Sequence, residues 1–398
     1  MGKSITFLRG QGGVPKTLPG EDHISAFVMY LPESHAMPTA VGGGGFTVEE
    51  PVKAISTIEK AEEYGITADA ASWHIRVLHY HLGEVFRINP AISLYVGLFN
   101  DAATGFDFSE LKMVQNFAAG RIRQIAVYAP TRNLVAADIT LLQGVANSLQ
   151  MQSQPVQVLY ASKVSEVTAL PQLRAIGQNR VSVDIGQDGE GLGSALFADA
   201  GNTPKQSVTT IGNLLGMVSL ASVHESIGWV QKFPSGITTP AFADGTLVRT
   251  VDRAVVEQLD TDGYLFLVTH PGIGGSYRND SHTLDEATSD YAFIEANRTM
   301  DKAERGIRTY LTPHLSRPLY VNAETGELAS DMVVFLEMEA GRQLDAMEAA
   351  GELSGYKVEV DSAQNVLASS MVEFVIKQVQ VGVMRRMKVK IGYTTKIS

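Results

Sequence analysis

Five ionisable residues crowd into one polar run in the second half of the sequence. The stretch YRNDSHTLDEATSDYAF, residues 277–293, carries them at short intervals: Asp280, His282, Asp285, Glu286 and Asp290. Carboxylates and imidazoles bind metals or transfer protons. A metal site needs three or four converging ligands, however, and no second histidine-containing cluster has ligand spacing. Because the run lies between a predicted strand and a predicted helix start, we interpret it as helix-capping scaffold and predict no metal ligands there.

A second group of candidate ligands lies in WHIRVLHYHLGEVF, a stretch predicted to be helical: His74, His79, His81 and Glu84. Two helical turns separate His74 from His81, which places them roughly 10.5 Å apart along the axis. That separation is too long for both to reach one metal at a ligand distance of about 2.0–2.1 Å. We predict that the histidines flank an apolar, core-facing stripe made of Ile75, Leu78, Leu82 and Val85.

Motifs for cofactor binding and covalent catalysis are incomplete. GQGGVPKT, residues 10–17, nearly matches a phosphate-binding loop, but Pro15 replaces the second glycine and has no N–H to offer a phosphate. The glycines after the strand predicted at 181–185 lack a third glycine at dinucleotide-binding spacing. No G-x-S-x-G elbow occurs, and the serines near His224 have no third group at useful spacing. We therefore predict no catalytic residues, no cofactor and a protein that is not an enzyme.

The composition is that of a folded globular chain. Hydrophobic residues make up 44% of the 398 residues and charged residues 19%. The net charge of −11 disfavours nucleic acid as a partner, because such binding depends on Lys and Arg. The chain has no cysteine, so it has no disulfides and no thiolate sites. Residues 1–20 lack a secretory pattern and no window is apolar over about 18 residues, so we predict assembly in the cytoplasm without membrane insertion.

The length predicts two domains, since single hydrophobic cores stop growing at roughly 250–300 residues. From Ile24 onward, apolar strand candidates alternate with helix candidates, which predicts a parallel sheet covered on both faces. The predicted strands include 94–99, 124–128, 156–160, 181–185 and 264–268, and the predicted helices are 70–87, 108–121, 136–151 and 208–223. We predict an α/β fold with a layered parallel-sheet domain over residues 24–275.

The last third of the chain predicts a smaller α+β C-terminal domain over residues 276–380. Amphipathic helices are expected at 290–311 and 331–350, and strands at 356–360, 371–379 and 387–393. Two arms flank the domains, an N-terminal arm at residues 1–23 and a C-terminal arm at residues 381–398. Near the end, MKVKI alternates apolar and basic side chains. An open strand edge of this kind has to pair with another strand.

The order of these elements resembles the contractile tail sheath proteins of bacteriophages, R-type bacteriocins and related injection systems. The stretches that carry the resemblance are ISAFVMYLP, VTTIGNLLGMVSLASVHESIGWVQKFPSGI, LDTDGYLFLVTHPGIGGSYRNDSHTLDEATSDYAFIEANRTMDKAERGIRTYL and the ending VEFVIKQVQVGVMRRMKVKIGY. The resemblance implies hexameric rings that stack helically around an inner tube and contract to drive the tube through a target envelope. It also implies assembly with baseplate and terminal cap proteins in a virion tail or injection particle.

In that family, the terminal arms are expected to add strands to the sheets of neighbouring subunits. The arm residues expected to do so here are Ile5, Phe7, Leu8, Met387, Val389, Ile391 and Tyr393. The expected hinges are Gly12, Gly13 and Gly382. The basic residues expected to contact a neighbour or the tube are Arg385, Arg386, Lys388 and Lys390, with a solvated strand face as the alternative.

The sequence is also compatible with a second function, that of an enzyme. An α/β enzyme would bind its ligand at the carboxyl ends of the strands, where open parallel sheets form a crevice. The predicted fold class and the polar clusters are the only support for this alternative, and fold class does not determine function. Stabilisation by a nucleotide or metal would favour the enzyme, whereas assembly into tubes would favour the sheath.

Overall fold

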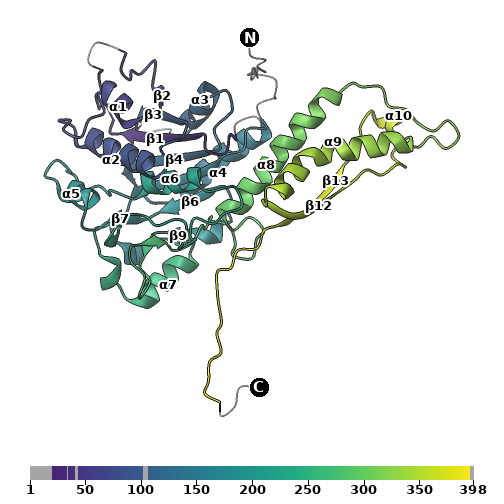
Figure 1. The fold of residues 1–398 in the computed structure, drawn as a ribbon. Helices are drawn as coiled ribbons and strands as arrows, with labels where there is room; N and C mark the ends of the chain where they lie inside the picture. Colours follow the sequence, from purple (N-terminus) through teal and green to yellow (C-terminus); the bar gives the residue numbers. More distant parts are fainter. Residues whose placement is uncertain (1–19, 34, 41–43, 102–105, 395–398) are drawn as a thin grey trace, which may run out of the picture.

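The computed structural model describes residues 20–33, 35–40, 44–101 and 106–394. Figure 1 shows a broad α/β part and a slender extension formed by the last third of the chain. A seven-stranded sheet lies at the centre of the α/β part, in the order β2-β3-β1-β4-β5-β6-β9. All of its strands run parallel except β2, the antiparallel edge. The strands are β1 (Ser25–Leu31), β2 (Val52–Ile55), β3 (Leu94–Asn100), β4 (Gln124–Asn133), β5 (Gln157–Lys163), β6 (Val181–Asp184) and β9 (Tyr264–Leu265).

The sheet is buried between two layers of helices, which explains the continuous apolar character of its strands. Every residue of β1 is buried, and successive side chains point to opposite layers. Val28 packs in the core of one layer and Phe27 in the core of the other. The first layer holds α3 (Glu110–Phe117), α4 (Ala136–Met151) and α7 (Arg253–Thr261), and the second holds α1 (Ile58–Glu63), α2 (Trp73–Ile88), α5 (Leu192–Ala198) and α6 (Ile211–Leu220).

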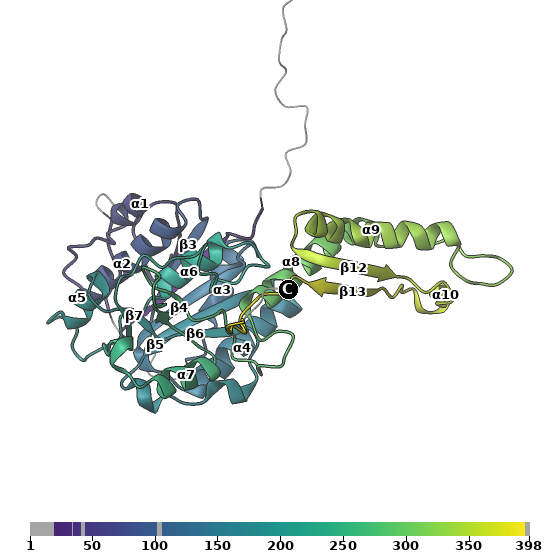
Figure 2. The same ribbon diagram turned by 60° about the horizontal axis from the view of Figure 1, so that its bottom comes forward.

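The extension contains two long helices and a two-stranded ribbon. Its elements are α8 (Ile294–Leu311), α9 (Ser330–Ala349), β12 (Leu353–Glu359), α10 (Val366–Ser369) and β13 (Val375–Gln380). Figure 2 shows the antiparallel β12–β13 ribbon lying alongside α9. Ala303 of α8, Leu344 of α9 and Leu353 of β12 share one small core. After β13 the described chain leaves this unit as a single extended segment, visible in Figure 1.

Two short pairs of strands complete the fold. The strand β7 (Gly186–Asp188) pairs with β8 (Pro240–Phe242), and β10 (Leu267–Val268) pairs with β11 (Tyr277–Arg278). Because β11 ends at Arg278, the polar run of residues 279–290 begins where the chain leaves this second pair.

The predicted α/β fold class is confirmed, and the helix predicted at 136–151 has those bounds as α4. The two C-terminal helices and the strands at 356–360 and 371–379 are present with shifted ends, as α8, α9, β12 and β13. The strand predicted at 264–268 is divided instead between β9 and β10, which belong to different sheets. The sequence pattern missed the short elements β2, β7, β8 and α5, because their few residues give little periodicity.

Two sequence interpretations are wrong. The polar run does not cap a helix, because Phe293 is extended, pairs with His282 and precedes α8 as an N-cap without a side-chain hydrogen bond. His81 does not flank the core of α2 but is fully buried inside it, beside the core-facing residues that were expected there. The strand predicted at 387–393 is absent from this single chain, where those residues are extended without pairing to another strand.

Candidate functional site at the roots of the two arms

A buried ion pair holds the start of the polar run against the sheet. The Arg278 guanidinium of β11 donates to Asp184 Oδ1 of β6 at 2.7 Å, and both side chains are fully buried. The same guanidinium donates to the Thr210 carbonyl at 3.0 Å and to the Asn213 side chain at 3.2 Å. Both terminal nitrogens of Arg278 are engaged in this way, while its buried Nε has no partner among the described residues. These contacts fix the point from which the polar run leaves the sheet.

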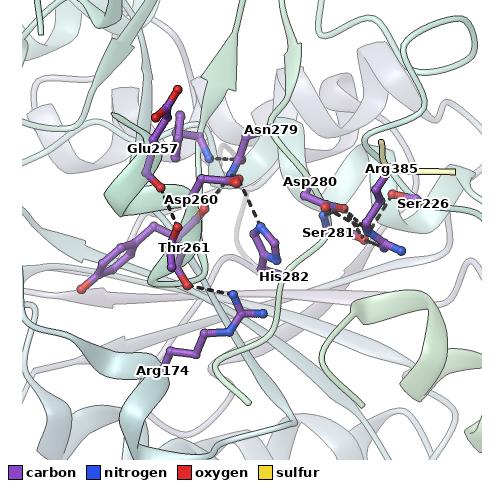
Figure 3. Close-up of polar contacts among 12 residues, drawn as sticks. Arg174, Ser226, Glu257, Asp260, Thr261, Asn279, Asp280, Ser281, His282 and Arg385 are labelled. Carbon is purple, nitrogen blue, oxygen red and sulfur yellow. Dashed lines mark hydrogen bonds and ion pairs between the residues drawn. The ribbon is translucent and has the colours of Figure 1, made fainter. Parts of the chain in front are cut away.

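Ser281 and His282 point to opposite sides of the polar run, as Figure 3 shows. His282 Nε2 lies 3.2 Å from Asp260 Oδ1 of α7. Burial acts to raise the pKa of Asp260, but the contacts with His282 and Asn279 outweigh it and lower the pKa overall. Ser281 Oγ instead donates to Glu295 Oε2 at 2.6 Å. The serine and the histidine therefore lack the mutual hydrogen bond that a nucleophile and its base require.

Of the other acidic residues of the run, Asp285 binds local partners, whereas Glu286 and Asp290 are exposed. Asp285 accepts from the Glu286 backbone N–H at 2.9 Å and from the Ser289 hydroxyl at 2.5 Å. Arg174 donates to the Asp285 carbonyl at 2.7 Å and to the Thr261 carbonyl at 2.9 Å (Figure 3). Within the described ranges, no group of three or more histidines and carboxylates is arranged to hold a metal ion.

The C-terminal arm is bound at its root by the opposite side of the run. Arg385 Nε donates to both oxygens of Asp280, at 3.0 and 2.9 Å. Its Nη2 donates to Glu295 Oε1 and to Ser281 Oγ. The guanidinium carbon lies 3.4 Å from the centre of the Phe293 ring. Burial raises the pKa of Glu295, and the Arg385 charge acts against that rise.

The N-terminal arm is bound at its root by the same helix, α8. Asp22 accepts from Lys302 Nζ at 2.8 Å and from Arg305 Nη2 at 2.9 Å. Burial acts to raise the pKa of Asp22, but the charges of Lys302 and Arg305 outweigh it and lower the pKa overall. Arg298 Nη2 donates to the Asp22 carbonyl at 3.3 Å, and Lys302 also binds Glu352 beside β12 at 2.6 Å. Both arms therefore leave the fold from contacts with α8.

The predicted arm residues fall into two groups. Ile5, Phe7, Leu8, Gly12 and Gly13 lie outside the described residues. In the C-terminal arm, the exposed fraction rises from 73% at Met387 through 81% at Val389 to 95% at Ile391, and Tyr393 is fully exposed. Gly382 is exposed, with no heavy atom within 4 Å of the position that a Cβ would take.

Arg385 binds carboxylates of its own chain, because the arm folds back over the start of α8. Its predicted contact with a neighbouring subunit or the tube stays a prediction. Arg386, Lys388 and Lys390 are exposed, and their prediction is unchanged. No local sequence pattern indicates the Arg385 contacts, since its partners lie 105 and 90 residues away along the chain.

The β12–β13 ribbon has open edges in the described structure. Each strand pairs only with the other there, and Val375, Lys377 and Val379 are exposed on β13. A groove of about 420 Å³ runs between the end of β13 and α8. Its lining includes Tyr291, Ala296, Thr299, Met300 and Gln378. Unpaired backbone groups on such edges can receive a strand from another chain.

The carboxyl ends of the strands hold charged groups that bind one another. Arg132 of β4 lies 3.2 Å from Asp101 and 3.0 Å from Asp138, and its guanidinium covers the Phe106 ring. The charged groups at this end of the sheet, where an α/β enzyme would bind its ligand, are thus paired with one another. None of the helices that the structure describes is both long and apolar enough to cross a membrane.

A cavity of about 480 Å³ lies elsewhere, between α2, β7 and residues 236–239. Three carboxylates line it, and each already accepts a hydrogen bond from a nearby group. Glu84 binds Arg87 at 2.6 Å, Asp188 binds the Gly191 N–H at 2.9 Å, and Glu190 binds Thr239 at 2.6 Å. The cavity therefore presents paired acidic groups, which by themselves do not indicate a ligand.

The family model described as the N-terminal domain of DUF2586 matches residues 34–282, more than half of the chain. The chain belongs to the DUF2586 family. The model of the DUF2586 C-terminal domain matches residues 290–398. The two family domains thus adjoin at the polar run, whose Asp280 lies in the first domain and whose neighbour Glu295 lies in the second. No curated protein matches this sequence.

Solved structures give the fold of this DUF2586 chain. A chain of the anti-feeding prophage baseplate is 14% identical with a TM-score of 0.61, covering 98% of this chain and 100% of that one. A chain of the contracted anti-feeding prophage helical sheath is 14% identical with a TM-score of 0.61, covering 97% and 99%. The sheath tail protein of Desulfitobacterium hafniense is 10% identical with a TM-score of 0.51, covering 94% and 100%. The DUF2586 chain therefore has the fold of contractile tail sheath proteins, as its sequence predicted.

Proposed function

We propose that this chain is the structural subunit of a contractile tail sheath and is not an enzyme. In this proposal it polymerises as hexameric rings stacked helically around an inner tube, and it contracts to drive the tube through a target envelope. Support comes from the fold shared with proteins of a contracted sheath and of a baseplate described as 6-fold symmetrised. A further support is that the chain matches almost the full length of those structures.

The observation that carries the proposal is the incomplete pairing of the C-terminal arm. Met387, Val389 and Ile391 are exposed at every second position, although a strand face of this kind normally packs on a sheet. In the described structure, the β12–β13 ribbon of the same chain has open edges. A segment such as the arm could pair with one of these edges as an added strand. An arm of one subunit paired with the ribbon of the next would satisfy both, by strand addition between chains.

The remaining parts of the proposal follow from this arrangement. Residues 24–275 form the α/β sheath domain, residues 276–380 the domain that faces the inner tube, and residues 1–23 and 381–398 the arms. The partners are other copies of the chain, the tube protein, and baseplate and terminal cap proteins. Assembly takes place in the bacterial cytoplasm, and the product is a virion tail or a contractile injection particle. Contraction needs only a few kcal/mol per subunit, because two packings of one sequence can differ by that little.

Electron microscopy of the purified chain tests the proposal. The full-length protein at high concentration is expected to form tubes or rings in negative stain. Truncation after Arg386 removes the proposed strand but keeps the Arg385 contacts, so it should abolish tubes and leave urea unfolding unchanged. Tubes that persist in the truncated protein would refute the role of the C-terminal arm, and a strictly monomeric full-length protein would count against the sheath.

Two matched variants distinguish the contribution of the arm's apolar face from that of its basic face. Met387→Ser, Val389→Ser and Ile391→Ser together remove the apolar face, and they should prevent assembly because that face packs on a neighbour's sheet. Lys388→Ser and Lys390→Ser together change the alternate face of the same segment and serve as the control. If the two sets of substitutions impair tubes equally, the arm acts through its charge or its length instead of through a packed strand.

A further inference from the structure

We propose that Asp280, Ser281, Phe293 and Glu295 form an arginine-binding site that fixes the root of the C-terminal arm to its own subunit. The bound residue is Arg385. In consequence the part of the arm that can reach a neighbour begins at Arg386, and Gly382 is not the pivot. The binding of Arg385 concerns the single subunit alone. Its consequence for assembly, a shorter arm that reaches a neighbour, rests on the proposed function.

The site matches the chemistry of a guanidinium on each of its sides. Asp280 takes both of its contacts from Nε, and Glu295 and Ser281 accept from Nη2, so in-plane donors are directed at oxygens from two sides. The Phe293 ring covers the face of the guanidinium at 3.4 Å, as in a stacked cation–π contact. A lysine at this position would keep the charge but could not reproduce the planar donors or the stacking.

Several contacts that shape the site do not involve the arm. Phe293 is held extended by its pairing with His282, and Ser281 Oγ donates to Glu295 at 2.6 Å. Glu295 is buried at the start of α8, so without Arg385 its carboxylate would lose a charged partner. The Arg385 side chain is only 26% exposed, whereas Met384 before it is 71% exposed and Met387 after it is 73% exposed. Arg385 is therefore the point at which a side chain of this exposed segment is held against the fold.

The anchor shortens the mobile arm. Residues 381–384 are held at both ends, by β13 at Gln380 and by Arg385, so rotation at Gly382 cannot carry the arm outward. From Arg386 to Thr394 the described chain spans at most roughly 30 Å when extended. A pivot at Gly382 would lengthen that reach to roughly 45 Å. The distance that the arm can span to a neighbouring subunit therefore depends on whether the chain pivots after Arg385 or at Gly382.

Paired spin labels can locate the pivot, and the absence of cysteine from the chain allows labels at chosen positions only. One label is attached at Ala137→Cys, an exposed position on α4, and the other at Met384→Cys or at Lys388→Cys. Electron–electron distances are measured on full-length subunits after assembled tubes have been removed by centrifugation. We expect a narrow distance distribution to position 384 and one at least twofold wider to position 388.

Substitutions then test the arginine site itself. Arg385→Ala should widen the distribution to position 384 at least twofold, Arg385→Lys should widen it less, and Arg386→Ala is the control that leaves it unchanged. A wide distribution at position 384 in the parent, or a width that Arg385→Ala does not alter, would overturn the anchor. Tube formation is scored separately, so failure of the anchor and failure of the sheath proposal give different results.

Discussion

His81 makes the acid stability of this protein a direct test of its core. The ring lies in α2, 5.5 Å from the Phe27 ring and 4.6 Å from the Tyr128 ring, and it is fully buried. Neither ring nitrogen has a hydrogen-bond partner among the described residues. Burial lowers the pKa of His81 from 6.5 to about 3, because nothing offsets the cost of charging the ring in an apolar core.

The size of the effect follows from that pKa. The folded protein keeps His81 neutral while the unfolded chain takes up a proton below pH 6.5. Since the folded-state pKa is depressed, this stability is fully present above pH 6.5 and is lost as the pH falls toward 3. At pH 5 the proton favours the unfolded chain about 30-fold, which lowers the free energy of unfolding by about 2 kcal/mol. At pH 4 the loss reaches about 3 kcal/mol.

His81→Leu removes this titration with a modest change in volume. Urea unfolding at pH 7.5, 5 and 4 gives the free energy of unfolding of both proteins. The difference between them should move in favour of the variant by about 2 kcal/mol between pH 7.5 and 5. His74, whose pKa burial lowers to about 4, is present in both proteins, so its contribution cancels. Leu78→Ala in the same helix is the control, and it should destabilise by a similar amount at every pH. A difference between His81→Leu and the parent that stays constant with pH would refute the reasoning.

Two further predictions concern packing around the sheet, and both are measured by urea unfolding at pH 7.5. Asp184→Asn leaves Arg278 buried without a charged partner, so we expect the free energy of unfolding to fall by about 3–5 kcal/mol. Glu257→Gln is the control, because it breaks an exposed pair and should change the free energy of unfolding little. Equal losses in the two variants would contradict the burial of the Asp184–Arg278 pair. Gly212→Ala places a Cβ 2.3 Å from the His81 carbonyl oxygen, which forces α6 away from α2 and should cost at least about 1–3 kcal/mol. Gly144→Ala in α4 meets no atom within 4 Å and should instead gain about 0.5–1 kcal/mol, so two changes of the same sign would refute the close approach of α2 and α6.

The parts of the fold that sequence predicts best are those with strong local periodicity. The apolar run of β1 and the amphipathic face of α8 each carry enough residues to identify the element and its type. His81 shows the limit of this reasoning. The sequence predicts His81 beside the apolar stripe of α2, but this second side of α2 also faces the core and packs against α6. There Gly212, which has no Cβ, allows the backbones of α2 and α6 to come close together. Which faces of a helix are covered depends on elements far away in sequence.

The candidate site was less predictable than the fold for the same reason. The alternation in MKVKI is local, so the sequence alone predicts a strand with one apolar face there, although the single chain forms no strand at these residues. The pairing of Arg385 with Asp280 and Glu295 depends on the return of the chain from β13 to the start of α8, which no local pattern encodes. Likewise, Asp22 gave no sign of binding Lys302, because charged pairs across hundreds of residues leave no spacing to recognise.

The position of both arm roots on α8 has a mechanical consequence for a sheath of the proposed kind. Load on the C-terminal arm enters α8 through Glu295, and load on the N-terminal arm enters it through Lys302, about 10 Å further along the helix. The helix is tied to the α/β part by Asp301, which binds Arg180 at 2.6 Å in a buried pair next to β6. Breaking one partner of a buried pair costs about 3–5 kcal/mol, which is as large as the few kcal/mol that contraction needs per subunit, so this pair opposes separation of α8 from the sheet. The arms would then turn the α/β part as one body, with the bending confined to the exposed chain beyond Arg385.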